Sequence, residues 1–487
     1  MATELTEDVA KHILRRMGFG GPSADVDQLL ALGSTTAAVN HMIDYDRIDN
    51  SALDAKLAAS FDWTPPLDNN KINQGEIRRR WITRMILTQR PFEEKMTLFW
   101  HNHFATALSK VSTEILMQVQ NETLRANALG RFDDLLLKVA QDPAMLIWLD
   151  TQQNRVNNIN ENFGRELMEL FTMGIKDVVT LDAPYTEADI KMVARCFTGW
   201  TFVRPNANQP FAYQFRLTAA NHDNGTKTVF AGTPYERTGN LDGTDIVTIL
   251  AARPSTPRYL VKKFFDFFVY PIDSSKSQDR NTVDRLADVY IANNHSIKEL
   301  ARAIFTSDEF FSDRARFGLV KIPVECVVGP IRMLGAQYNP GGPVDRRDNT
   351  TQQRTARLGM QLFEPPDVAG WDPQLAWINT ALMLERYNVA EQFAITRVTD
   401  PTTPGAFLTI DQLRKFVKTN PKKTVNKFLG ALNVDTDSQT VKTLRNYLQA
   451  DDNGNPGVFD PTTDAVIDKK IRGLVHLIMS LPEFQLN

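Results

Sequence analysis

Two histidines separated by a single residue are the first candidates for chemistry in this sequence. His101 and His103 lie in the run Trp100-His101-Asn102-His103-Phe104. Histidine is the commonest metal ligand, and its imidazole also suits acid–base catalysis. On a helix, residues two apart point about 200° apart and could not share a metal ion, whereas in an extended segment they could. The competing interpretation is structural: a helix from Pro91 places His103 in the core and His101 at the surface.

A second candidate pair, His222-Asp223, lies in the segment Asn221-His222-Asp223-Asn224-Gly225. Asp, Asn and Gly are typical of turns, so one interpretation is a simple surface loop. A His-Asp pair on a loop also suits metal ligation or an oriented general base. The predicted ligands of a divalent metal ion are therefore His101, His103, His222 and Asp223, although the sequence does not identify the metal.

Carboxylates and one arginine gather between residues 150 and 187. Asn162, Arg165, Glu166 and Glu169 share one face of an expected helix, opposite its apolar face. Such a face is ordinarily a solvated surface with Arg–Glu pairs. The alternative is a site where the acids transfer protons and Arg165 pairs an acid or holds an anionic group. The predicted catalytic residues are Asp150, Glu161, Arg165, Glu166, Glu169 and Glu187.

The overall composition excludes several classes of protein. The chain has 487 residues, is 42% apolar and has a net charge of −3. It lacks the basic stripe that nucleic acids require, so we predict no nucleic-acid partner. No apolar run approaches the ~18 residues that span a bilayer. The first residues resemble no signal peptide, so the expected location is cytoplasmic, or exported if a leader was removed. Cys196 and Cys326 alone cannot form a disulfide framework.

The elements that must position these residues are mainly helical. Helical spacing and capping signals recur along the chain, for example over residues 91–103 and 186–197. Residues 200–243 are rich in Pro, Asn, Thr and Gly, and alternation within them predicts two or three short strands. The predicted fold is mainly α, a large multi-helix globular body (residues 1–400) with a small β-rich insertion around 200–243. A C-terminal helical subdomain (401–487) packs on it, with the boundary near Asp400-Pro401.

Several short motifs follow one another in a specific order. They are His12-Ile13-Leu14-Arg15-Arg16-Met17-Gly18-Phe19-Gly20, Glu94 to Phe104, Asp142-Pro143-Ala144-Met145, Asn160 to Phe171, Tyr185-Thr186-Glu187, Thr198-Gly199-Trp200, His222-Asp223 and Phe363 to Trp371. Their order over roughly residues 10–395 resembles the bacterial family known as domain of unknown function 1800. The resemblance implies a predominantly helical protein, often with an export signal, whose biochemical role is not established. The resemblance favours a functional role for the histidines and carboxylates that fall within the motifs.

Four functional hypotheses follow from these residues. Metal-assisted hydrolysis fits the His and carboxylate ligand types best. A metal-dependent oxidoreductase uses the same ligands. A metal-free glycosidase or lyase would rely on two of the carboxylates. In a non-catalytic binding or assembly protein, the same residues would form a buried polar network that fixes the packing of helices. The substrate, whether a small molecule or a polymer, and the oligomeric state are not set by the sequence.

Overall fold

The computed structural model describes residues 3–65, 67, 71–206, 208–342, 350–398, 400, 402–451 and 453–487. Over these residues the protein is mainly α-helical with three two-stranded sheets, as the sequence predicts. Pro401, which marks the predicted subdomain boundary, lies outside the described residues. The division into residues 1–400 and 401–487 stays a prediction.

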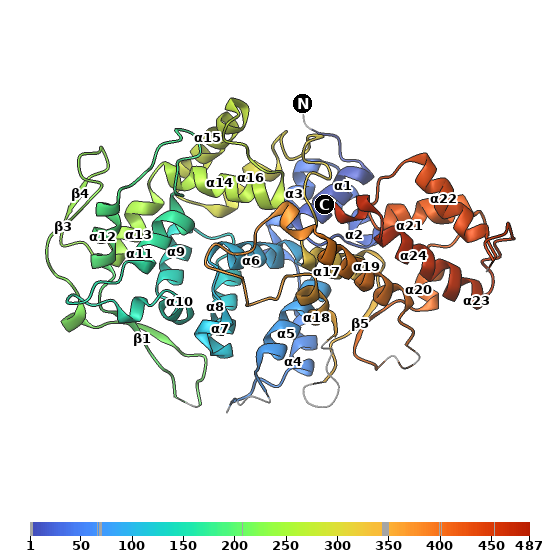
Figure 1. Cartoon of the computed structure of the whole chain (residues 1–487), viewed down its shortest axis with the longest axis horizontal. Helices are drawn as coiled ribbons and strands as arrows, with labels where there is room; N and C mark the ends of the chain where they lie inside the picture. The colour runs from blue at the N-terminus through green and yellow to red at the C-terminus, as the bar shows by residue number, and fades with distance from the viewer. Residues whose placement is uncertain are drawn as a thin grey trace.

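The first half of the chain forms helices on both sides of the central helix α6 (Figure 1). Their bounds are α1 (Glu7–Met17), α2 (Ser23–Leu30), α3 (Thr35–Ile43), η1 (Tyr45–Arg47), α4 (Ser51–Ser60), α5 (Gln74–Leu87), α6 (Pro91–His103), α7 (Leu108–Val111), α8 (Glu114–Ala126), α9 (Phe132–Ala140), α10 (Pro143–Trp148), η2 (Thr151–Gln153), α11 (Asn162–Glu166), the π-helical η3 (Leu167–Thr172) and α12 (Glu187–Cys196). The predicted capping box begins α12, where Thr186 and Asp189 exchange side-chain to backbone hydrogen bonds.

The β-rich insertion consists of two separate hairpins. β1 (Trp200–Val203) pairs with β2 (Gln214–Leu217), and β3 (Lys227–Val229) pairs with β4 (Arg237–Gly239), both antiparallel. The short η4 (Ala219–Asn221) joins them. Figure 1 shows the β1–β2 hairpin and the α4–α5 pair both reaching downward from the body, on either side of α7 and α8.

The second half of the chain is again helical. Its elements are α13 (Gly243–Ala251), α14 (Ser255–Phe268), α15 (Ser277–Ala292), α16 (Ile297–Phe305), α17 (Pro323–Met333), β5 (Gln337–Asn339), α18 (Thr350–Arg357), η5 (Gln374–Trp377), α19 (Thr380–Ile395), β6 (Gly405–Phe407), α20 (Ile410–Arg414), α21 (Pro421–Ala431), α22 (Ser438–Gln449), α23 (Asp464–Val466), the π-helical η6 (Ile467–Ile471), α24 (Arg472–Met479) and η7 (Pro482–Gln485). The antiparallel pair β5–β6 was not predicted.

Two large apolar clusters form the core. One is built mainly on α1, α6, α9 and α14, and the other joins α5 and α17 to α19, α21 and α24. Helix α6 contributes to both clusters, through Phe99 to the first and Leu98 to the second. In the part of the chain that the structure describes, no helix has the length and apolarity needed to cross a membrane.

Candidate functional site

Helix α6 carries the Trp100–Phe104 motif into the interior. Pro91 begins this helix at its first position, with Glu93 and Glu94 in the first turn, where carboxylates favour the helix dipole. The helix continues to His103, so His101 and His103 are both helical. Their side chains therefore point about 200° apart. Both imidazoles are buried, His101 included, and they do not converge on one point.

Two residues of this motif hold the backbone of the loop at 363–371. His101 Nε2 accepts a hydrogen bond from the N–H of Phe363 (3.2 Å), a residue with the left-handed φ of +63°. Asn102 Oδ1 accepts one from the N–H of Trp371 (2.7 Å). A Cβ at Gly370 would lie 2.5 Å from the Asn102 carbonyl oxygen, so only glycine allows this close approach. The loop is thus fixed on the end of α6.

Trp100 and His103 of the same motif hold other segments of the chain. His103 Nε2 donates to the carbonyl of Phe171 (3.0 Å), near the end of η3, where a helix leaves its last carbonyls without internal partners. The indole N–H of Trp100 donates to the carbonyl of Ala128 (2.9 Å). We call Trp100, His101, Asn102 and His103 the α6 hub, because each binds a segment distant in sequence.

Burial keeps both imidazoles of the α6 hub neutral. It lowers the pKa of His101 to about 3, and burial together with the charge of Lys263 lowers the pKa of His103 to about 3. His103 Nδ1 is buried and has no hydrogen-bond partner among the described residues. In that part of the chain, no three His, Cys, Asp or Glu side chains are grouped so that they could hold a metal ion. The metal-ligand assignment therefore gains no support and stays a prediction.

Four of the six predicted catalytic residues do meet, at Arg165. Its guanidinium pairs with both carboxylate oxygens of Glu187 (2.8 Å each) and approaches Glu161 (3.5 Å) and Glu169 (3.4 Å). The Glu187 side chain is 70% exposed, so this cluster lies at the surface. The hydrogen bond from Arg165 lowers the pKa of Glu187. Glu166 is separate from these pairs, and burial and the charge of Glu169 raise its pKa.

Asp150 has a different partner. It follows α10 with the left-handed φ of +57°, and its carboxylate accepts a hydrogen bond from Lys110 Nζ (2.8 Å). The same ammonium group donates to the carbonyl of Trp148 (2.6 Å), one of the last carbonyls of α10. The pair Lys110–Asp150 therefore closes the end of this helix, and no described residue of the Arg165 cluster takes part in it.

The pair His222-Asp223 is tied to the end of α12. Asp223 accepts hydrogen bonds from Arg195 Nε (2.7 Å) and Nη2 (3.2 Å), and the hydrogen bonds from Arg195 lower its pKa. His222 Nδ1 donates to the carbonyl of Thr198 (2.8 Å). The structure thus places His222 and Asp223 beside one another, as predicted from their order, but holds each by a separate structural contact.

A groove that the sequence analysis did not predict lies over α8. Its volume is about 680 Å³, and residues from α5, α8, α9, the segment after α4 and the β1–β2 hairpin line it. We call it the α8 groove. Ligand sites are typically concave, with aromatic walls and a few polar groups, and this groove has both features.

Aromatic side chains form one side of the α8 groove. Trp63, Phe211, Tyr213 and Phe215 line it, and all four are half-buried. The rings of Trp63 and Phe211 lie 6.1 Å apart with an interplanar angle of 31°, so the segment after α4 meets the hairpin loop here. The sequence offers a signal for this wall, because Phe211, Tyr213 and Phe215 are spaced two apart; of these, Phe215 lies in β2.

Polar side chains from the helices face the same groove, and several have unused hydrogen-bonding capacity. Trp63 Nε1, Arg80 Nε and Gln118 Oε1 are buried atoms without a hydrogen-bond partner among the described residues. An unmade hydrogen bond of a buried polar group costs about 1–3 kcal/mol. These three atoms are closed to solvent, so a ligand with hydroxyl or amide groups would reach them only after the side chains turn towards the groove.

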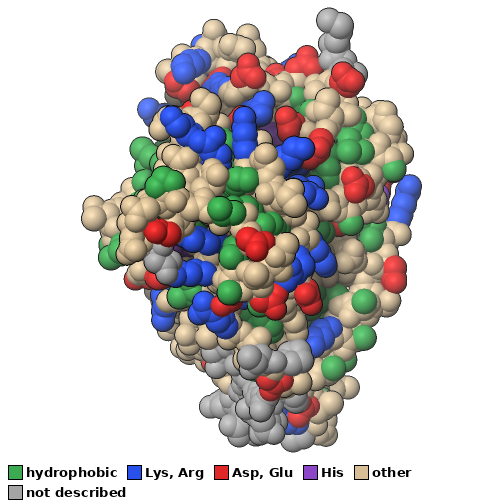
Figure 2. All heavy atoms as spheres, turned by 90° about the vertical axis from the view of Figure 1, so that its right-hand side faces the viewer, with side chains coloured by type: hydrophobic (Ala, Val, Ile, Leu, Met, Phe, Trp, Pro, Cys, Tyr) green, Lys and Arg blue, Asp and Glu red, His purple; other side chains and the backbone are tan. Residues whose placement is uncertain are grey.

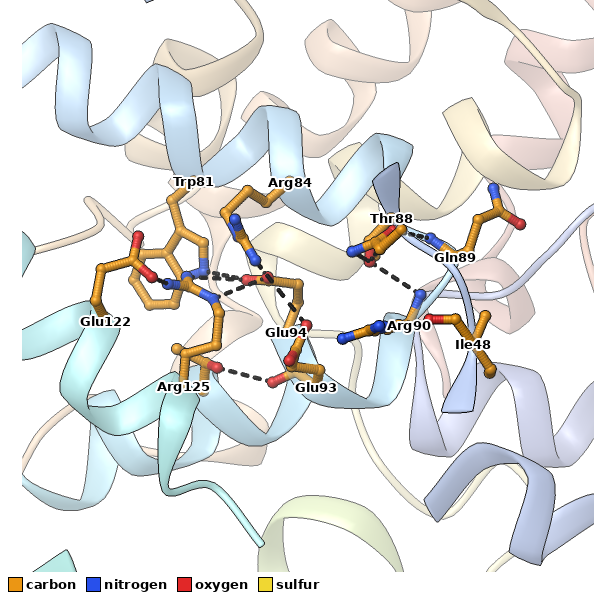
Figure 3. A network of polar contacts seen from close by, with 12 residues as sticks. Ile48, Trp81, Arg84, Thr88, Gln89, Arg90, Glu93, Glu94, Glu122 and Arg125 are labelled. Carbon is orange, nitrogen blue, oxygen red and sulfur yellow. Dashed lines mark hydrogen bonds and ion pairs between the residues drawn. The ribbon is translucent and has the colours of Figure 1, made fainter. Parts of the chain in front are cut away.

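A buried network of charged side chains is connected to the groove through Glu122 (Figure 3). Glu94 is fully buried and accepts hydrogen bonds from Arg84 Nε (2.7 Å), Arg125 Nε (2.9 Å) and the indole of Trp81 (3.0 Å). Burial opposes ionisation, but the charges and hydrogen bonds of the two arginines lower the pKa of Glu94 to about 2. Arg125 also donates to Glu122 (2.6 Å), which lines the groove. The network therefore fixes one carboxylate of the groove.

A second carboxyl group of the groove is in a different electrostatic state. Asp142 is buried and caps α10, accepting hydrogen bonds from the N–H of Met145 (3.1 Å) and the amide of Gln120 (2.9 Å). Burial raises the pKa of Asp142 to about 7 despite these bonds. By contrast the charges of nearby arginines, Arg125 first, outweigh burial and lower the pKa of Glu122.

Comparison with known protein families gives one match. The family model described as "Protein of unknown function (DUF1800)" matches residues 12–486. The match extends the resemblance past residue 395 to the C-terminal helices. No curated protein and no solved structure matches the chain. Because the family model covers nearly the whole chain, this protein belongs to the DUF1800 family of proteins of unknown function.

Proposed function

We propose that this protein binds a neutral carbohydrate chain in the α8 groove. The observation that carries the proposal is the groove itself, about 680 Å³ with four half-buried aromatic rings beside polar side chains with unpaired atoms. The apolar C–H face of a sugar ring packs on an aromatic face, and its hydroxyl groups both donate and accept hydrogen bonds. Trp63 and Arg80 offer donors, and Gln118 offers an acceptor.

The charges of the groove favour a neutral ligand. Arg80 and Lys138 are balanced by Glu122 and, when ionised, by Asp142. Lys138 is already held by Asn127 (2.5 Å), and the charge of Glu122 acts on Arg80. A polyanion would meet two carboxyl groups without a surplus of cations. A neutral saccharide meets no such penalty.

This proposal takes the binding alternative among the four hypotheses from the sequence. Metal-assisted hydrolysis and metal-dependent oxidation rest on His101, His103, His222 and Asp223. His101, His103 and His222 each have a ring nitrogen in a hydrogen bond to backbone, and Asp223 pairs with Arg195. Those hypotheses remain predictions without a structural observation in their favour. The polar network of the α6 hub instead supports a role in packing.

Titration calorimetry with neutral oligosaccharides built from glucose, mannose, galactose or N-acetylglucosamine tests the proposal. We expect one of them to bind the wild-type protein, and Tyr213→Ala to weaken that binding about tenfold, since an aromatic contact contributes about 0.5–1.5 kcal/mol beyond its buried area. Tyr235→Ala is the matched control, because Tyr235 is an exposed aromatic on the other hairpin. The proposal is wrong if no oligosaccharide binds, or if both variants bind equally well.

The opposite electrostatic states of Asp142 and Glu122 favour a second candidate, glycoside hydrolysis in the same groove. A protonated acid and an ionised carboxylate are the pair that this reaction uses. Asp142 would give its proton to the leaving oxygen, and a water activated by Glu122 would add to the sugar carbon. Release of reducing ends from a bound oligosaccharide, abolished in Asp142→Asn while binding persists, would favour hydrolysis over binding alone.

A further inference from the structure

A second cavity has a volume of about 270 Å³ and shares no lining residue with the α8 groove. It is formed by α1, the segment at 311–317 and the segment at 430–435 that follows α21. The lining residues include His12 and Arg15, which come from the motif that begins the family match. Neither residue has a role in the proposed carbohydrate site.

Arg15 is held in position by a chain of contacts. His12 Nε2 lies 2.9 Å from the carbonyl of Phe310 and donates to it, so His12 Nδ1 is free to accept from Arg15 Nη2 (3.2 Å). Burial lowers the pKa of His12 well below its usual range, which keeps this acceptor neutral. The guanidinium also stacks on Phe317, at 4.3 Å from the ring centroid. Phe317 has the left-handed φ of +54°, a strained conformation for a bulky residue.

The carboxylates of Glu325 and Asp8 act on the charge of Arg15 only from a distance. The side chain is 5% exposed, and burial lowers its pKa to about 10, so it stays protonated at neutral pH. Among the described residues no carboxylate lies within ion-pair distance of it, and its Nε has no hydrogen-bond partner. Buried charges in proteins are ordinarily paired, because an unpaired one costs several kcal/mol. Arg15 therefore brings to the wall of the cavity a buried positive charge that has no ion-pair partner among the described residues.

We propose that this cavity binds a small molecule with a single carboxylate group, which pairs with Arg15. The guanidinium fork matches a carboxylate in a two-pronged hydrogen bond. The other cations are already neutralised, since Lys11 pairs with Glu7 (2.6 Å) and Arg316 with Asp435 (3.1 Å). Only one positive charge is thus left for the ligand. Two further carboxylates, of Asp8 and Asp313, line the cavity and disfavour a dianion such as phosphate.

The surroundings favour the approach of an anion. Helix α21 exposes Lys422, Lys423 and Lys427 beside the segment that lines the cavity. Figure 2 looks at this end of the molecule and shows many Lys and Arg side chains with Asp and Glu among them. Such a field raises the local concentration of small anions without providing specificity. Specificity comes from the buried Arg15.

Calorimetry and thermal unfolding of the full chain, at constant ionic strength, test this site. The probes are acetate, lactate, glycine and inorganic phosphate. We expect at least one carboxylate to bind and raise the melting temperature, and phosphate to bind more weakly. Arg15→Gln should weaken carboxylate binding about 10- to 100-fold, because it removes a charge-assisted hydrogen bond of about 1.5–3 kcal/mol. Arg285→Gln, which changes an exposed arginine outside the cavity, should bind like the wild type.

A second variant keeps the test informative if Arg15→Gln fails to fold. A Cβ at Gly430 would meet only Lys11 Nζ, at 3.6 Å, so Gly430→Phe has room to place its ring in the cavity. It should abolish the response to carboxylates while the chain stays folded. Binding of phosphate in preference to every carboxylate would refute the assigned ligand class. Carboxylate binding that survives in both variants, or no binding by the wild type at 10 mM (about the weakest affinity expected for a single ion pair), would refute the site.

Discussion

The α6 hub and the α8 groove both contain buried polar side chains, but they use them differently. In the hub, Trp100, His101, Asn102 and His103 each form a hydrogen bond with a distant backbone segment. In the groove, polar atoms remain without partners although the groove is open to a ligand. Buried polar groups that are fully paired stabilise one packing arrangement, whereas those left over after folding are available for binding.

The difference shows that residue type alone does not tell which polar side chains stay unpaired after folding. Two histidines in one motif are reactive only if folding leaves a ring nitrogen accessible, and the hub buries both. The groove instead combines aromatic, Gln and Arg residues with two carboxyl groups, those of Asp142 and Glu122. Substitutions in the two regions should therefore have opposite signatures: loss of stability without loss of binding in the hub, and the reverse in the groove.

The largest effect is expected in the charge network between the two regions. Glu94→Gln removes the buried negative charge to which Arg84 Nε and the Nε and Nη2 atoms of Arg125 donate hydrogen bonds (Figure 3). We expect it to lower the free energy of unfolding by about 3–5 kcal/mol, since breaking a buried ion pair leaves uncompensated charge. Denaturant unfolding followed by circular dichroism measures this change.

The same network predicts the acid sensitivity of the fold. The native pKa of Glu94 is about 2, below its usual value near 4.5, so its contribution is fully present above that usual value. It is lost as the pH falls towards 2, and a shift of this size corresponds to roughly 3 kcal/mol. The difference in stability between wild type and Glu94→Gln should therefore shrink between pH 5 and pH 2. A constant difference over that range would contradict the assigned state of Glu94.

A smaller effect is expected within the hub. His101→Leu removes the acceptor of the Phe363 N–H in a fully buried position. An unpaired buried amide costs about 1–3 kcal/mol, and we expect a loss of about 2–3 kcal/mol with imperfect packing included. The variant should keep its metal content and its affinity for any groove ligand. Loss of a bound metal ion with unchanged stability would instead restore the metal-site hypothesis.

In the groove, Asp142 should make stability fall with rising pH. Its native pKa of about 7 lies above its unfolded value near 3.8, so the folded state holds the proton more tightly. The wild type therefore loses stability as the pH rises from about 4 to 7, by an amount on the order of 2–4 kcal/mol. Asp142→Asn keeps an acceptor for Met145 and Gln120 but cannot ionise. Its stability relative to wild type should rise between pH 5 and pH 8.

Sequence patterns predicted the elements of this protein better than its contacts. Helices α6 and α12 have local signals, Pro91 at the start of one and the Thr186–Asp189 capping box at the start of the other. The pair β5–β6 has none, because three-residue strands show no alternation and residues 337 and 405 are far apart in the chain. The partners of His101 are equally non-local: the Phe363 N–H is 262 residues away, and no periodicity encodes it.

The smallest effect is expected at the surface cluster, where the sequence placed its catalytic carboxylates. Glu187→Gln leaves Arg165 with Glu161 and Glu169, and the Glu187 side chain is largely exposed. Exposed ion pairs contribute about 0–1 kcal/mol, so stability should hardly change, in contrast to Glu94→Gln. Both glutamates pair with arginines at similar distances, but Glu94 is buried between two arginines, whereas Glu187 is exposed and pairs with Arg165. If Glu187→Gln instead abolished an activity found in the wild type, the Arg165 cluster would be a catalytic site at the surface, and pairing would no longer distinguish structural from functional residues.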